Sequence, residues 1–175
     1  CFVGKVHLPT FLQQKLKASE GLIIEISKDF NNSRHEGLPA DNISESELAE
    51  LARPHSFENS DGKEIGQHNG AHFFTIGQRK GINIGGYKEP LFVLGTDVQK
   101  NLIYVGEGQS HPGLYRKGLF IRKDEIHWIR PDMEMRSGES REYMVRIRYR
   151  QPLQKAKLFM KDKGMYVIFC KLQRG

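Results

Sequence analysis

The sequence KLFMKDKGMYVIFC, residues 157–170, contains two apolar runs on either side of the polar stretch Lys161-Asp162-Lys163-Gly164. Such runs around a short glycine-containing turn predict an antiparallel hairpin. Upstream, the segment 143–150 alternates between two sets of side chains, Tyr143, Val145, Ile147 and Tyr149 on one side and Met144, Arg146, Arg148 and Arg150 on the other. This alternation predicts a strand with a core face and a basic face. Together they predict an antiparallel meander typical of small barrels.

Shorter strands are predicted earlier in the chain, at residues 22–26, 71–76, 91–94 and 102–105. Residues 8–17 carry leucines at a four-residue spacing and predict a short amphipathic helix. We therefore expect a mainly β chain in two parts. Residues 1–117 form a small, roll-like central β-rich domain with a short N-terminal helix, and residues 118–175 form a truncated antiparallel β-barrel.

Residues 29–61 differ from their surroundings in composition, with eight acidic residues against two basic ones. We interpret this stretch as an acidic insertion at the surface, mobile for most of its length. Inside it, Ser44 and Glu47 have the spacing of a capping box, and Pro54 follows, which predicts one short helix. No chemistry is visible in this segment.

The composition is that of a globular protein: 175 residues, 38% hydrophobic, 27% charged and a mean hydropathy of −0.57. No stretch approaches the roughly 18 apolar residues of a membrane helix, so no membrane partner is expected. Only Cys1 and Cys170 are present, which favours a reducing, cytoplasmic compartment over a disulfide framework. The chain opens on Cys1 and ends directly after a strand-like run, and we interpret it as a piece of a longer protein whose closing strands are missing.

Basic charge is concentrated near the C-terminus. The chain has a net charge of +6, and residues 146–175 contain nine basic residues against Asp162 alone. Such a cluster favours a polyanionic partner, because bound cations release the counterions of a phosphate backbone. An exposed basic face that only keeps the protein soluble gives the same pattern.

The stretch GQRKGINIGG, residues 77–86, follows a predicted strand and carries two adjacent cations between glycines. It is neither a Walker loop nor a dinucleotide fingerprint, because the lysine precedes a glycine and no Ser or Thr follows. One interpretation is a hairpin turn with exposed charge. The other is that glycines let the backbone approach a phosphate while Gln78, Arg79 and Lys80 donate hydrogen bonds.

Other candidates for chemistry are few. An accessible Cys1 would suit a nucleophile or a sulfur carrier, or it could end a strand, whereas Cys170 fits a small hydrophobic residue. His68 and His72 are four residues apart, but turn and strand signals surround them, so no metal site is predicted. Trp128 could stack on a base, although a single Trp in an alternating apolar run fits the core.

Three stretches in order resemble the bacterial tRNA-specific 2-thiouridylase family: CFVG at 1–4, GQHNG at 66–70 leading into TIGQRKG at 75–81, and RYRQ at 148–151. The resemblance spans nearly the whole chain, with residues 29–61 as a lineage-specific insertion. It implies a central domain followed by a barrel like those of translation factors. It also implies an N-terminal ATP-pyrophosphatase domain with a Ser-Gly-Gly-x-Asp-Ser loop, which this sequence lacks.

The resemblance further implies an activity. The parent enzyme would adenylate the C2 oxygen of the wobble uridine of tRNA with ATP and Mg²⁺ and replace it with sulfur. Cys1 matches the family's persulfide-carrying cysteine, which can pair with a second cysteine absent here. Arg148 and Tyr149 match the part of the barrel that touches tRNA, and Gln78, Arg79 and Lys80 would face the same ligand. A cysteine desulfurase or sulfur-relay protein would donate the sulfur, and the fragment alone would be inactive and bind no cofactor.

Two other classes of function stay open. One is a non-catalytic RNA-binding module, whose binding would not need Cys1. The other is an N-terminal-nucleophile hydrolase in which Cys1 attacks with its own α-amine as base. Length and strand count disfavour the hydrolase, which needs two large stacked sheets.

Overall fold

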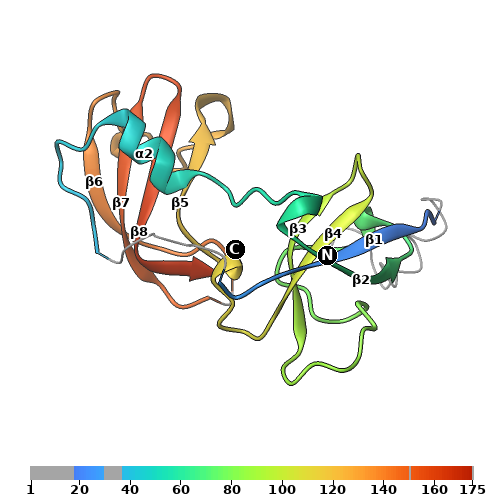
Figure 1. Ribbon diagram of the computed structural model, residues 1–175. Coiled ribbons are helices and arrows are strands. Elements are labelled where there is room, and N and C mark those ends of the chain that lie inside the picture. The colour runs from blue at the N-terminus through green and yellow to red at the C-terminus, as the bar shows by residue number, and fades with distance from the viewer. Residues whose placement is uncertain (1–17, 30–36, 150, 175) are drawn as a thin grey trace. The chain divides into compact units, whose positions relative to one another are not determined.

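A computed structural model describes residues 18–29, 37–149 and 151–174 (Figure 1). In these residues the chain is mainly β. The strands are β1 (Gly21–Ile26), β2 (Gly62–His68), β3 (Leu91–Asp97), β4 (Leu102–Glu107), β5 (Tyr115–Arg122), β6 (Ser140–Val145), β7 (Gln154–Lys161) and β8 (Gly164–Arg174). The α-helix is α2 (Glu45–Ala52), and the 3₁₀ turns are η1 (Asn59–Asp61), η2 (Ala71–Phe73), η3 (Pro112–Leu114), η4 (Lys123–Glu125) and η5 (Pro131–Met133). No helix of the described segments is long and apolar enough to cross a membrane.

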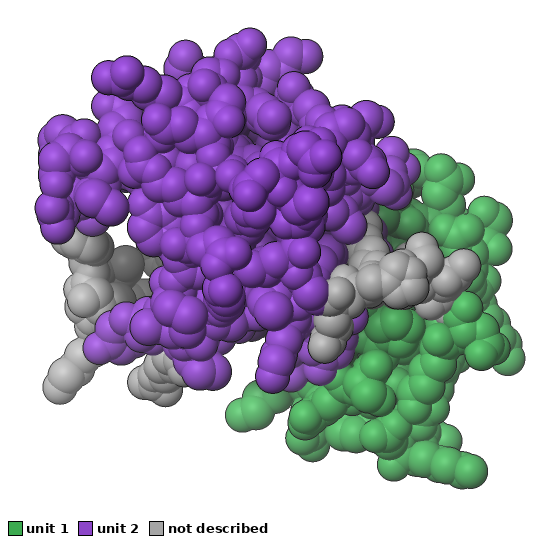
Figure 2. Space-filling model, turned by 90° about the vertical axis from the view of Figure 1, so that its left-hand side faces the viewer, with its two compact units in different colours: residues 1–31, 56–114 green, residues 32–55, 115–175 purple. Residues whose placement is uncertain are grey.

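The chain divides into two compact units, coloured separately in Figure 2. Unit 1 comprises Cys1–Asn31 and Ser56–Leu114, and unit 2 comprises Asn32–His55 and Tyr115–Gly175. This division differs from the predicted domains, because the middle of the acidic insertion clusters with the C-terminal sheet. Each unit therefore contains two stretches that are separate in the sequence.

Unit 1 is built on a four-stranded sheet in the order β2-β1-β4-β3. β1 runs antiparallel to β2 and parallel to β4, while β3 and β4 form a hairpin. The strands predicted at 22–26, 91–94 and 102–105 are confirmed. Its core gathers apolar residues from three strands and from the segments between β2 and β3, including Ile23, Val93, Ile103, Val105, Ala71 and Ile82.

The strand predicted at 71–76 is not formed. Residues 71–73 make the 3₁₀ turn η2, and an irregular segment follows as far as β3. The amides of Phe73 and Phe74 donate to the carbonyls of Gly70 and Ala71, both at 3.1 Å, and the amide of Ala71 donates to Oδ1 of Asn101 at 2.9 Å. Because acceptors within the turn and on Asn101 satisfy these amides, they do not enter a β-ladder.

Unit 2 is built on an antiparallel sheet in the order β5-β8-β7-β6. The predicted hairpin is confirmed, with Lys161 paired to Gly164 across the turn between β7 and β8. β8 lies between β5 and β7 and is paired on both sides. The four strands form an open sheet and do not close into a barrel.

Both faces of this sheet are covered, because the apolar side chains of β7 and β8 alternate between two clusters. On one face Leu158, Val167 and Phe169 pack with Met135 and Trp128. The other face packs against α2, a cluster that comprises Phe159, Tyr166, Ile168, Leu48, Leu51 and Ala52. A sheet buried on both faces explains why β7 and β8 read as nearly continuous apolar runs.

The helix predicted inside the acidic insertion is confirmed with its capping box: the Ser44 side chain accepts from the amide of Glu47 at 3.2 Å, and Glu47 Oε2 accepts from the amide of Ser44 at 3.0 Å. The prediction of a surface excursion is wrong for this helix. Leu48 is fully buried and Ala52 is buried against the sheet. An amphipathic helix needs an apolar partner, and the outer face of β7 and β8 supplies it.

Two buried lysines fasten the segment before α2 to the sheet. Nζ of Lys117 donates to the carbonyls of Gly37, Phe169 (2.6 Å) and Cys170 (3.2 Å). Nζ of Lys157 donates to the carbonyl of Pro39 at 3.1 Å. A buried ammonium must be hydrogen-bonded to offset its desolvation, so these carbonyls are part of the fold.

Candidate nucleic-acid interface

Cys1, the predicted persulfide carrier, lies outside the described residues, so its role stays a prediction. Cys170 is a free, half-buried thiol on β8. Its neighbours Ile168 and Phe169 are fully buried in unit 2, which agrees with the interpretation of Cys170 as a small hydrophobic residue.

The glycine loop, residues 77–86, is attached to the edge of the unit 1 sheet. The amide of Gly77 donates to the carbonyl of Val93 at 2.7 Å, and the amide of Val93 donates to the carbonyl of Gln78 at 2.9 Å. Further along, Ile82 is 4% exposed and packs in the unit 1 core together with Ile84. The loop therefore packs against the sheet and is not a simple hairpin turn, although its charges are exposed as the first interpretation has it.

The side chain of Gln78 organises this loop from within. Its Oε1 accepts from the amide and the hydroxyl of Thr75 at 3.2 and 3.1 Å, and its Nε2 donates to the carbonyl of Lys80 at 2.8 Å. The adjacent Arg79 and Lys80 are exposed. Gln78 thus fixes the backbone from which two cations project into solvent.

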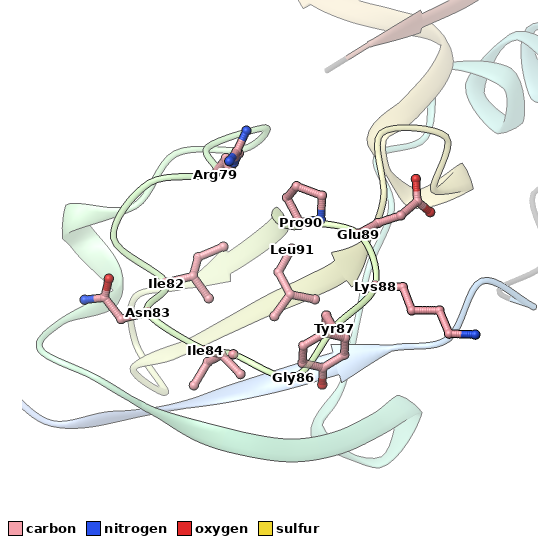
Figure 3. Close-up of a pocket in the computed structure, with 11 residues that line it drawn as sticks. Arg79, Ile82, Asn83, Ile84, Gly86, Tyr87, Lys88, Glu89, Pro90 and Leu91 are labelled. Carbon is pink, nitrogen blue, oxygen red and sulfur yellow. The ribbon is translucent and has the colours of Figure 1, made fainter.

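A pocket of about 350 Å³ lies beside the loop (Figure 3). Arg79 and Lys88 both line it, together with the apolar side chains of Ile82, Ile84 and Leu91. The sequence analysis did not identify Lys88. The feature that could have indicated it is a cation placed two residues after the pair Gly85-Gly86. The third charged group, Glu89, is paired with Lys28 at 2.7 Å, which leaves the pocket with a positive balance.

The backbone is open at one side of this pocket. A Cβ atom added at Gly85 or Gly86 would meet no atom within 4 Å. Gly86 has a φ of 90°, a conformation that favours glycine, whereas Gly85 does not have a positive φ. Neither packing nor backbone conformation therefore requires a glycine at position 85. The missing side chain allows a ligand to approach the backbone there.

Tyr87 ties the end of the loop to β1. Its hydroxyl donates to Oε2 of Glu25 at 2.8 Å. Burial, followed by the hydrogen bond to Glu25, raises the pKa of Tyr87 to about 12. The phenol consequently remains a neutral donor throughout the physiological range.

The basic strand predicted at 143–150 is only half formed. β6 ends at Val145, which pairs with Gln154, the first residue of β7. Pro152 stands just before β7 and has no amide hydrogen for a ladder, so pairing stops there, and the described residues 146–149 and 151–153 lie in a loop outside the strands. Tyr143 and Val145 face the core as predicted, whereas Ile147 and Tyr149 are exposed, a correction to the predicted core face.

This second loop, the Arg-Tyr loop, presents an aromatic ring and cations to solvent. Tyr149 is 86% exposed, and the guanidinium of Arg146 lies 5.7 Å from its ring centroid. Gln151 shapes the turn: its Oε1 accepts from the amide of Ile147 at 3.3 Å, and its amide donates to the carbonyl of Arg148 at 3.0 Å. Arg148 and Tyr149 belong to unit 2, while Gln78, Arg79 and Lys80 belong to unit 1.

Part of the basic charge counted in the sequence has a partner within unit 2. Lys157 is 7% exposed and pairs with Asp41, and Lys155 pairs with Glu142 at 2.6 Å. The hydrogen bond that Lys155 donates to Glu142 raises the pKa of Lys155. Four other cations of this region, Arg146, Arg148, Lys163 and Lys171, are exposed.

His68, the first of the two neighbouring histidines, makes contacts within the fold of unit 1. Nδ1 of His68 accepts from the amide of Gly70 at 2.9 Å, and its ring packs edge-on against Phe74. Burial lowers the pKa of His68, which keeps the imidazole neutral. Within the described ranges, no group of three or more His, Cys, Asp or Glu side chains is placed to hold a metal ion.

Comparison with known proteins agrees with this two-part architecture. Residues 49–107 match the tRNA methyl transferase PRC-barrel domain, and residues 119–175 match the aminomethyltransferase beta-barrel domain. The chain thus falls in a class of two-part β proteins in which these domains follow one another.

Relatives along nearly the whole chain define the family. The chain is 50% identical over 169 residues to the tRNA-specific 2-thiouridylase MnmA of Christiangramia forsetii, covering 97% of this chain and 42% of the relative. It is 49% identical to that of Flavobacterium johnsoniae, with the same two shares, and 32% identical to that of Chlamydia trachomatis, covering 97% of this chain and 36% of the relative. The chain belongs to the tRNA-specific 2-thiouridylase family and spans about two fifths of the length of the curated relatives it matches first.

Proposed function

We propose that this chain is the tRNA-binding and sulfur-carrying part of a tRNA-uridine 2-sulfurtransferase that makes 2-thiouridine at the wobble position. The observation that carries this proposal is the 50% identity, over 97% of the chain, to a protein named tRNA-specific 2-thiouridylase. The substrate follows from that name, and the residues described above supply a physical means of binding it.

In this proposal the Arg-Tyr loop contacts tRNA directly. Arg146 and Arg148 approach phosphate oxygens, and the exposed ring of Tyr149 stacks on a base or packs on a ribose. The loop is suited to this because Arg146 already lies over the Tyr149 ring, so both groups are held together before the RNA arrives.

The glycine loop makes a second contact. Arg79 and Lys80 bind backbone phosphate, and Gln78 acts as a positioning residue because its amide is occupied within the loop. Contacts to phosphate position the RNA and carry no sequence information. Selection of particular tRNAs therefore depends on other groups.

Cys1 is the proposed catalytic residue. As a persulfide, its terminal sulfur would attack C2 of an activated uridine, forming the C–S bond as the C2–O bond to the leaving group breaks. A second cysteine thiol would then attack the Cys1 sulfur and break the bond between Cys1 and the transferred sulfur. The 2-thiouridine would leave, and the two cysteines would remain as a disulfide. After a thiol reductant has cleaved this disulfide, a cysteine desulfurase or sulfur-relay protein would reload Cys1 in the cytoplasm.

ATP and Mg²⁺ would activate the uridine in the parent enzyme. This sequence contains no Ser-Gly-Gly-x-Asp-Ser motif, so its own residues do not fit that site, and no step is assigned to them there. The proposed part of this chain is limited to binding the RNA and presenting sulfur.

The RNA-binding half of the proposal is tested by measuring tRNA affinity at several salt concentrations. Arg148→Ala should weaken binding and reduce the slope of log K against log salt by about 1, the change expected for one lost phosphate contact. Arg122→Ala is the matched control, because this exposed arginine of unit 2 pairs with Asp124 and Glu125. An unchanged slope in Arg148→Ala would remove the Arg-Tyr loop from the interface.

The chemical half is tested in cells whose only copy of the full-length parent is intact or carries Cys1→Ser. Nucleoside mass spectrometry should find 2-thiouridine in tRNA from the intact strain alone. Persistence of 2-thiouridine in the mutant would leave a non-catalytic RNA-binding module as the better description. Release of ammonia or acid by the purified chain without ATP or RNA would instead indicate the hydrolase.

A further inference from the structure

Unit 2 contains a pocket of about 540 Å³ that shares no residue with the glycine loop or the Arg-Tyr loop. It lies between the end of β7 and the segment that follows β5. Its lining residues are Lys123, Ile126, Trp128, Pro131, Asp132, Glu134, Met135, Arg136, Ser137, Met160 and Lys161. The volume is in the range of small-molecule sites.

The walls are held in place by backbone hydrogen bonds at both ends of the segment. At one end the amide of Lys123 donates to the carbonyl of Lys163 at 3.1 Å. At the other, Gly138 donates to the carbonyl of Met160 and Met160 donates to the carbonyl of Glu139, both at 2.9 Å. The pocket is therefore a fixed part of unit 2.

The floor of the pocket is apolar and includes an aromatic ring. Met135 and Met160 are 3% and 7% exposed, and the half-buried Trp128 and Ile126 pack against the same cluster. An indole beside two polarizable thioethers is a good surface for a flat ring.

The rim carries charge of both signs with a positive balance. Lys123, Arg136 and Lys161 are its cations, and Asp132 and Glu134 its carboxylates. Asp132 is already paired with Arg130, whose Nε lies 3.1 Å from Oδ1, and this hydrogen bond lowers the pKa of Asp132. Three cations around one remaining carboxylate favour an anionic ligand.

We propose that this pocket binds one nucleotide, with the base against Trp128 and the phosphate at the cations of the rim. Glu134 would accept a hydrogen bond from a base N–H group. The nucleotide comes either from solution or as an unpaired residue of RNA; the second source rests on the proposed function.

The chain offers a site-specific probe, because Trp128 is its only tryptophan. We would titrate the 175-residue chain with AMP, UMP, adenosine, a single-stranded RNA oligomer and tRNA, and follow tryptophan fluorescence. Saturable quenching by the phosphorylated ligands is expected, with weaker binding of adenosine. Quenching by AMP or UMP indicates the soluble source, and quenching by the RNAs alone indicates the unpaired residue. Absence of quenching by every ligand would overturn the proposal.

Variants test the phosphate contact. Arg136→Ala should weaken nucleotide binding about tenfold, the loss of one charge-assisted hydrogen bond, while leaving the melting temperature unchanged. Lys171→Ala, an exposed lysine of β8 outside the pocket, should bind as the parent chain does. The assignment of the phosphate to the rim would be overturned if Arg136→Ala bound the nucleotide as tightly as the parent chain does and adenosine bound as tightly as AMP.

The two proposals fail separately. Quenching by mononucleotides in a chain that does not bind tRNA would retain the pocket and contradict the proposed function. If Arg148→Ala lost tRNA binding while no ligand quenched the tryptophan of the parent chain, the proposed function would be retained and the pocket proposal contradicted.

Discussion

Nζ of Lys157 lies 2.8 Å from Oδ1 of Asp41, so a lysine of the C-terminal sheet is paired with a carboxylate from the acidic insertion. Lys157 is almost fully buried, and it also donates to the carbonyl of Pro39. The hydrogen bond from Lys157, followed by one from Ser140, lowers the pKa of Asp41. A cation that the sequence assigns to a basic surface therefore holds unit 2 together.

Lys157→Ala should destabilise unit 2 by about 1–3 kcal/mol, because it removes the donor of the Pro39 carbonyl and the cation that pairs with Asp41. Urea unfolding followed by Trp128 fluorescence reports on this unit, which contains the only tryptophan. Lys171→Ala replaces an exposed lysine of β8 and should stay within about 0.5 kcal/mol of the parent chain. Equal midpoints for the two variants would show that the Lys157 contacts contribute nothing.

Leu48→Ala should cost about 2–5 kcal/mol, the usual range for truncating a fully buried leucine. It should also expose the chain around α2 to limited proteolysis, because this helix is held by packing against Phe159, Tyr166 and Ile168. Ser46→Ala, on the exposed side of α2, is the control. Rapid cleavage inside α2 of the parent chain would contradict the packed position.

His111 predicts a pH dependence of the stability of unit 1. The side chain is fully buried; its Nε2 lies 3.1 Å from the carbonyl of Ile26, and its Nδ1 accepts from the amide of Gly113 at 3.1 Å. This pairing assigns the proton to Nε2, and burial lowers the pKa below its ordinary value of 6.5. The folded state therefore resists protonation that the unfolded state accepts.

Because the unfolded chain then binds more protons, the stability of unit 1 should fall as the pH drops below about 6.5. Melting curves of the parent chain and His111→Asn between pH 7.5 and pH 5 would measure this. The variant should be less stable at neutral pH but lose less stability on acidification. Parallel pH profiles would assign the dependence to another group.

Gly85→Ala should leave stability within about 0.5 kcal/mol, because the added Cβ meets no atom within 4 Å and the backbone is not left-handed. If RNA approaches the glycine loop there, the same methyl group should weaken tRNA binding several-fold, which a filter-binding titration measures. Unchanged affinity would place the RNA elsewhere. Gly106→Ala is the contrasting variant: its Cβ would lie 2.6 Å from Cδ2 of His111 and should destabilise unit 1.

Local sequence was sufficient to predict an element where its pattern was compatible with only one secondary structure. The β7–β8 hairpin, the strands β1, β3 and β4, and the capped helix α2 all follow from periodicity, turn residues and capping chemistry. The family likewise follows from three short motifs in a fixed order. Alternation failed at Ile147, because whether an alternating segment remains a strand depends on a partner strand, and Pro152 ends that pairing.

The sequence by itself determined the mainly β fold, the two candidate binding segments around Arg79 and Arg148, and the family of the chain. Only the tertiary structure decided that α2 covers the C-terminal sheet, that Lys117 and Lys157 are buried in it, and that Arg79 and Lys88 line one pocket. The reason is physical: periodicity and capping act between residues close in sequence, whereas burial and ion pairing depend on which distant residues meet. A lysine has the same local signature whether it faces an RNA phosphate or a buried carbonyl.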